Sequence, residues 1–268
     1  MGDRGSVLSL TRTGIWVLLV LAALNGLFLY FVPAQAEEHY AWSIVPPVNA
    51  AFIGAGFLAG TLATGLVLAF ATRWRTFATL PVALWVLAAS LFAATLIHAD
   101  RFKFGYPPTW VWTLVYAGVP LAIPFLVARQ RANADEPPPR DPRLVPLRAV
   151  SAVAGAGLLV GAIALYAAPV DVGEHWPWPL TPLLARAVAA WYALFGTLLV
   201  SSAVGLRTPA EALVGYATLG CWSVLVLALA PLYPDDVDAG AAWYALMLAL
   251  LAISVYALTL ALPERRRL

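Results

Sequence analysis

The residues best suited to chemistry occur in a short pattern of acidic, imidazole and indole side chains. The pattern E-H-x-x-W appears twice, 136 positions apart, in Glu38, His39, Trp42, Glu174, His175 and Trp178. Carboxylates and imidazoles bind metal ions and act as general acids and bases, and indole rings bind apolar or cationic groups. These six residues are therefore predicted to contribute to a ligand-binding site if the fold brings the two elements together.

A metal or haem centre is one interpretation of the three histidines, which all lie at the same predicted face of the membrane. The candidate metal ligands are His39, His98, His175 and Asp100. Such a set suits zinc or copper, and paired imidazoles can ligate haem. However, adjacent Glu and His do not have the usual spacing of metal ligands. The alternative is that no cofactor is bound and that the rings lie at the membrane interface, where His, Trp and Tyr orient the following helices.

Arg186 is the only charged residue predicted to lie inside a membrane-spanning segment and not at its first residue, and it is one turn after Pro182. Its planar guanidinium could bind a lipid phosphate or one of the two Glu carboxylates, which adds Arg186 to the candidate ligand-binding residues. Alternatively, the side chain extends along its own apolar stem to reach water. The equivalent position in the first half is Ala50, so a site at Arg186 would be asymmetric.

The residues that are missing exclude several classes of protein. No Asp, Glu, Lys or His is predicted near the centre of a membrane span, which argues against a proton-coupled pump and against haem buried between helices. The sequence also lacks a phosphate-binding P-loop, a nucleophile elbow and an H-E-x-x-H motif. Catalytic residues are therefore unknown, and we favour a non-enzymatic role.

These residues must be positioned by helices that cross a membrane. Apolar residues make up 62% of the chain and charged residues 11%, which is typical of an integral membrane protein. A membrane span needs roughly 20 apolar residues in helical conformation. We predict an all-α protein with about eight transmembrane helices, at residues 14–33, 47–71, 77–97, 109–128, 148–168, 181–205, 211–231 and 241–262.

The two halves of the chain resemble each other. Without a gap, residues 12–62 and 148–198 are identical at 14 of 51 positions, which indicates an internal repeat. Each half holds four spans, an even number, so we predict two parallel four-helix repeats at 1–128 and 148–268. A Pro- and Arg-rich cytoplasmic linker at 129–147 joins them. The segment 94–102 has no recognisable counterpart around 229–238.

The distribution of basic residues predicts the orientation. With both termini cytoplasmic, 13 of the 16 basic residues lie on the cytoplasmic side, as the positive-inside rule requires. Topology and contact with the lipid bilayer explain these charges, so we expect no nucleic-acid partner. A single Lys beside abundant Ala, Arg and Pro suggests a bacterium with a GC-rich genome, and hence the inner membrane.

Three classes of function remain open. The first is a transporter-like protein, or one that binds a lipid or small solute, with an outward-facing site between the repeats. The second is an outer-face redox protein that depends on metal or haem, or a lipid-modifying enzyme. The third is an accessory subunit that joins an oligomer or a larger membrane complex and has no site of its own.

Overall fold

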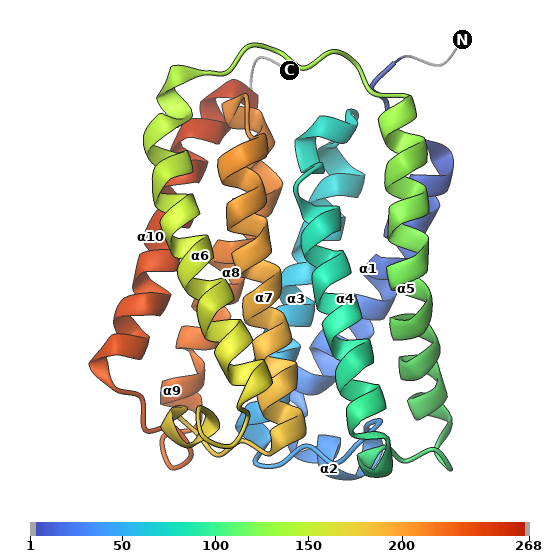
Figure 1. Cartoon of the computed structure of the whole chain (residues 1–268), viewed down its shortest axis with the longest axis vertical. Coiled ribbons are helices and arrows are strands. Elements are labelled where there is room, and N and C mark those ends of the chain that lie inside the picture. The colour runs from blue at the N-terminus through green and yellow to red at the C-terminus, as the bar shows by residue number, and fades with distance from the viewer. Residues whose placement is uncertain (1–3, 266–268) are drawn as a thin grey trace.

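Eight helices long and apolar enough to cross a membrane make up most of the chain (Figure 1). The computed structural model describes residues 4–265. The spans are α1 (Ser9–Phe31), α3 (Pro47–Phe70), α4 (Leu80–Ile97), α5 (Pro107–Ala132), α6 (Val145–Ala167), α7 (Pro182–Gly205), α8 (Leu213–Leu227) continued by α9 (Leu229–Leu232), and α10 (Ala241–Arg265). The prediction of an all-α chain with eight membrane-length segments is confirmed.

Short helices mark the two ends of the bundle. One end carries α2 (Ala36–His39), η1 (Pro33–Gln35), η3 (Ala99–Arg101) and η5 (Gly173–His175). We call it the histidine end, because all three histidines lie there. The other carries η2 (Trp74–Phe77), η4 (Pro142–Leu144), η6 (Pro209–Ala212) and the segment that joins α5 to α6. We call it the linker end; α1 begins there and α10 ends there (Figure 1).

Proline sets the boundaries of several helices. Pro47, Pro107 and Pro182 are the first residues of α3, α5 and α7, where the missing N–H group has no helical acceptor to lose. The predicted seventh span is interrupted at Ala228, between α8 and α9. Pro231 explains this interruption, because it cannot donate to the Leu227 carbonyl four residues earlier and its ring clashes with it.

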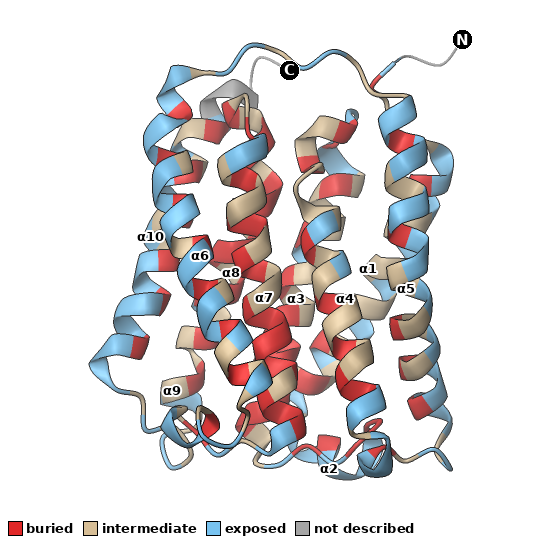
Figure 2. Ribbon diagram, viewed as in Figure 1, coloured by how far each residue is buried: buried red, intermediate tan, exposed pale blue. Residues whose placement is uncertain are grey.

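The central helices are α3, α7 and α8. They are largely buried, whereas few residues of α1 and α5 are buried (Figure 2). Helix α1 packs along α3, and α6 packs along α7. Helix α4 contacts α7 and α5, while α8 contacts α3 and α10. The exposed outer helices are rich in Val, Leu and Ile, as expected of surfaces that face lipid.

Small residues allow two helix pairs to approach closely. A Cβ atom added to Gly155 of α6 would lie 2.9 Å from the Gly196 carbonyl oxygen of α7. A Cβ atom on Gly54 of α3 would lie 2.5 Å from the backbone nitrogen of Tyr30 in α1. Membrane helices associate through such backbone contacts because lipid provides no hydrophobic driving force between them.

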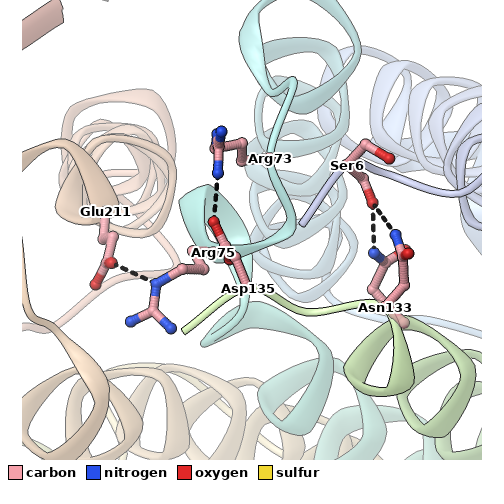
Figure 3. Close-up of polar contacts among 7 residues, drawn as sticks. Ser6, Arg73, Arg75, Asn133, Asp135 and Glu211 are labelled. Atoms are coloured by element: carbon pink, nitrogen blue, oxygen red, sulfur yellow. Dashed lines mark hydrogen bonds and ion pairs between the residues drawn. The ribbon is translucent and has the colours of Figure 1, made fainter. Parts of the chain in front are cut away.

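Polar contacts hold the linker end together (Figure 3). Arg75 Nε lies 3.2 Å from Glu211 Oε1 and so joins η2 to η6, and Arg73 forms an ion pair with Asp135 of the linker. The Ser6 carbonyl accepts from Gln130 Nε2 at 2.7 Å and from Asn133 Nδ2 at 3.3 Å. The chain before α1 is thereby fastened to the end of α5.

Candidate functional site

The first E-H-x-x-W element lies on α2 and the loop that follows it. The Glu38 and His39 side chains are exposed at the histidine end, whereas Trp42 is only 2% exposed. Lys103 Nζ donates to the carbonyl oxygens of Glu37 and Glu38, and Lys103 N donates to the Ala41 carbonyl at 3.0 Å. The α4–α5 loop therefore holds this element by its backbone.

Trp42 is packed among aromatic rings that belong to the same half of the chain. Its ring centroid lies 4.8 Å from that of Trp112, 5.0 Å from Tyr40 and 5.1 Å from Phe102. Its Nε1 atom is buried and has no hydrogen-bond partner. An amphipathic ring at the lipid–water interface was the alternative interpretation of this residue, but the structure places it in the protein core.

The second element has the same placement but different partners. Glu174 and His175 lie exposed on η5, and Trp178 is 2% exposed. Trp178 Nε1 donates to Asn49 Oδ1 of α3 at 3.0 Å, and Asn49 Nδ2 donates to the Pro179 carbonyl at 3.1 Å. The buried Asn49 side chain thus fastens the second element to a helix from the first half.

The candidate metal ligands do not form a cluster. Among the side chains of residues 4–262, no three His, Cys, Asp or Glu groups lie so that they could hold a metal ion. His39 and His175 are exposed on different short helices, and Asp100 pairs with the neighbouring Arg101 at 3.2 Å. His98 contacts none of these three residues through a hydrogen bond; its side-chain partner is Arg186.

Arg186 and His98 are the two predicted residues that the structure brings into direct contact. Arg186 Nη1 lies 2.8 Å from His98 Nε2. Arginine is always protonated and can only donate, so His98 must accept through a neutral Nε2. The guanidinium also lies 5.7 Å from the centre of the Tyr166 ring of α6. Arg186 Nε is buried and has no hydrogen-bond partner.

The surroundings of His98 favour its neutral form. Burial lowers the pKa of His98, and the nearby Arg186 guanidinium lowers it further, against the opposing effect of Asp100. The neutral ring is the form that can accept from Arg186, so geometry and charge agree. His98 follows the C-terminus of α4, in the segment 94–102 that has no counterpart in the second half. Both His98 and Arg186 were predicted as candidate site residues, but the sequence did not indicate that they contact each other.

An open pocket of about 520 Å³ lies beside the second element. Its lining includes the acids Glu174, Asp236 and Asp238 and the indoles of Trp176 and Trp178, and no basic side chain. None of the three acids forms an ion pair in the part of the chain that the structure describes. Asp238 N donates to the Pro177 carbonyl at 2.8 Å, which holds the α9–α10 loop against the second element.

Two of the predicted binding residues, Glu174 and Trp178, line this pocket, whereas Glu38, His39, Trp42, His175 and Arg186 are not among its lining residues. Sequence reasoning missed Trp176, Asp236 and Asp238. The available signal was the acidic run after Tyr233-Pro234, which resembles any solvated loop until its contact with Pro177 is known.

Comparison of the chain with known protein families, with curated proteins and with solved structures found no match. The functional argument therefore depends on the geometry of the histidine end.

Proposed function

We propose that this protein is a membrane-embedded binding protein that takes up a small organic cation from the histidine end. The observation that carries the proposal is the pocket formed by Glu174, Asp236 and Asp238 beside the partly exposed indole of Trp176. Three carboxylates without a basic partner make the pocket negative, and indole faces attract cations. A ligand with a primary or quaternary ammonium group matches both features.

The arrangement favours an organic cation over a metal ion. A bare metal ion needs several oxygen ligands within about 2.0–2.6 Å of one point. No three acidic or imidazole groups converge in that way among the side chains that the structure describes, those of residues 4–262. Carboxylates spread around an open pocket suit a larger cation with diffuse charge, and the partly exposed Trp176 supplies apolar surface for its alkyl groups.

Choline binding, measured by tryptophan fluorescence on the protein in nanodiscs, tests this proposal. We expect saturable binding that weakens with added salt, and none for 3,3-dimethyl-1-butanol, the uncharged analogue of the same shape. Asp236→Asn and Asp238→Asn should each weaken binding by about fivefold, from about 1 kcal/mol per partly solvated charge pair. Asp100→Asn is the matched control, because Asp100 is an exposed acid at the same end but outside the pocket.

Equal binding of choline and its uncharged analogue would contradict the proposal. So would an unchanged affinity in the Asp236→Asn/Asp238→Asn double variant. Absence of binding by choline, tetramethylammonium and putrescine alike would also reject it, because these probes cover quaternary and primary ammonium groups of different lengths.

We also propose that the bundle consists of two parallel four-helix repeats. Matched contacts support this arrangement. Arg12 Nη2 donates to the Leu68 carbonyl, and Arg148 Nε, 136 positions later, donates to the Ala203 carbonyl. The Tyr30 hydroxyl donates to the Leu225 carbonyl of α8, and the Tyr166 hydroxyl donates to the Ser90 carbonyl of α4. The ion pair between Arg75 and Glu211 joins two positions that are themselves 136 residues apart.

The proposed orientation places the linker end in the cytoplasm of a bacterial inner membrane. The arginines of η2, η4 and the linker lie at that end, as the positive-inside rule requires. The acidic pocket then opens to the outside. Reporter fusions after Arg140 and after Asp238 test this orientation: the first should be cytoplasmic and the second external, and the reverse result would contradict it.

A further inference from the structure

A second open groove lies at the linker end, far from the acidic pocket. Residues of α6 and α7 line it: Val145, Arg148, Ala149, Ala152, Ala203 and Val204. Its volume is about 490 Å³. We propose that this groove binds one anionic phospholipid, with the phosphate at Arg148 and an acyl chain along the apolar wall. This site is independent of the proposed cation pocket.

The packing of α6 on α7 accounts for the groove. The two helices touch backbone to backbone at Gly155 and Gly196. Towards the linker end, the facing residues are Ala149, Ala152 and Ala203, whose short side chains leave the space between the helices unfilled. The groove is therefore a consequence of small residues placed beyond the point of closest approach.

Two arginines supply the charge at the mouth of the groove. Arg148 Nε donates to the Ala203 carbonyl at 2.6 Å, and Arg140 Nη2 donates to the Val204 carbonyl at 3.4 Å. Each of these arginines uses a single nitrogen in these contacts. Neither pairs with an acid among residues 4–262, whose side chains the structure describes. Their remaining N–H groups are suited to phosphate oxygens, which guanidinium binds in a two-pronged geometry.

The position of the groove identifies the ligand as a lipid. Val145 and Val204, which line it, and Val153 beside it are exposed apolar residues on a surface that faces the bilayer. Arg148 lies one turn after the start of α6, which places its charge at the depth of lipid headgroups. Basic pockets between membrane helices attract anionic headgroups, with a contribution near the surface from each arginine.

Native mass spectrometry tests the proposal on the full chain. The protein in mild detergent is mixed with equal amounts of dioleoyl phosphatidylglycerol and dioleoyl phosphatidylcholine, and the detergent micelle is then removed in the mass spectrometer. We expect one phosphatidylglycerol to be retained per chain in preference to phosphatidylcholine. Arg140→Gln and Arg148→Gln should each reduce this retention by about fivefold. Arg131→Gln is the matched control, because Arg131 is exposed at the same end on α5, at the opposite side of the bundle (Figure 1).

A second pair of variants tests the groove without changing charge. Ala152→Leu fills the groove and should displace the lipid, whereas Val153→Leu, on the neighbouring exposed position outside the lining, should not. Thermal unfolding in detergent checks that each variant is folded. If Arg148→Gln fails this check because it loses its contact with α7, then Arg140→Gln and Ala152→Leu still decide the question.

Three results would overturn the proposal. The first is equal retention of the two lipids by the wild type. The second is an equal loss of phosphatidylglycerol in Arg131→Gln, which would indicate general attraction to a basic surface. The third is displacement of the lipid by glycerol 3-phosphate, which would indicate a site for a soluble phosphate.

Discussion

Trp42 and Trp178 form a matched pair that isolates the contribution of one buried hydrogen bond. Both indoles are 2% exposed. Trp178 Nε1 donates to Asn49 Oδ1, whereas Trp42 Nε1 is buried without a partner. Replacement by Phe removes the same N–H group and a similar volume at both positions. The packing terms therefore largely cancel when the two variants are compared.

The difference between the variants can be estimated from the geometry. Trp178→Phe leaves Asn49 Oδ1 buried and unpaired, at a cost of about 1–3 kcal/mol. Hydrogen bonds measured between membrane helices average about 0.6 kcal/mol and reach about 1.7 kcal/mol. Trp42→Phe instead removes a donor that was already unpaired, and so relieves a desolvation cost. We expect Trp178→Phe to lower the free energy of unfolding by about 1–3 kcal/mol more than Trp42→Phe.

Unfolding in mixed micelles by dodecyl sulfate, followed by circular dichroism, measures this difference. A double-mutant cycle with Asn49→Ala should give a coupling free energy of about 1 kcal/mol with Trp178→Phe, and none with Trp42→Phe. Equal destabilisation by the two Phe variants, or a cycle without coupling, would refute the assignment of Asn49 as the partner that fastens the second element.

Two further predictions concern charge and packing. The lowered pKa of His98 means that the unfolded chain takes up the proton first, so this contribution to stability is complete above pH 6.5 and is lost as the pH falls through the lowered pKa. The unfolding temperature should fall more steeply below pH 6.5 in the wild type than in His98→Asn, and parallel curves would contradict the contact with Arg186. Gly54→Ala should destabilise the protein by about 1–3 kcal/mol, because its Cβ would lie 2.5 Å from a backbone atom of Tyr30. Gly65→Ala, on the same helix with nothing within 4 Å, should be neutral or stabilising by up to about 1 kcal/mol in the same assay, and a shared sign would contradict the packing of α1 on α3.

The membrane spans could be predicted from the sequence because hydropathy alone determines them, but their ends could not. The fourth predicted span, 109–128, is a helix over Pro107–Ala132. Its last turn is polar, so the apolar segment that predicts the span ends before Arg129. The helix continues because the buried Gln130 accepts from Leu8 N and Thr11 Oγ1 and donates to the Ser6 carbonyl. Contacts between residues more than 100 positions apart cannot be inferred from the local pattern of one sequence.

Of the acidic and indole residues that line the pocket, the sequence predicted only Glu174 and Trp178, and it did not indicate which candidate residues would be partners. Arg186 was expected to hold a phosphate or a glutamate, and His98 a metal. The packing of α4 against α7 instead places these two side chains together. Asp236 and Asp238 had no signal beyond an acidic loop, because their significance depends on the backbone contact with Pro177. Helix packing therefore determines which polar residues of this chain can act together.

The asymmetry of the histidine end can be traced to two adjacent positions in the proposed repeat. The first half has Asn49-Ala50 where the second has Ala185-Arg186. Neighbouring residues on a helix point about 100° apart. Asn49 therefore contacts Trp178 and Pro179 of the second half, whereas Arg186 contacts His98 of the first. Helix α3 of the first half thus holds the segment at Trp178 and Pro179, whereas α7 of the second half contacts the end of α4 at His98.

This difference between the two elements changes the charge around each of them. The second element is fixed by Asn49, and it presents Glu174 and Trp176 to the acidic α9–α10 loop. The first element is fixed instead by the Lys103 ammonium, which donates to the backbone carbonyls of Glu37 and Glu38 and adds a positive charge there. A cation that binds three unpaired carboxylates would be repelled by a lysine in the equivalent place. Because the lining of the acidic pocket includes no basic side chain, the proposed cation site is confined to the second element.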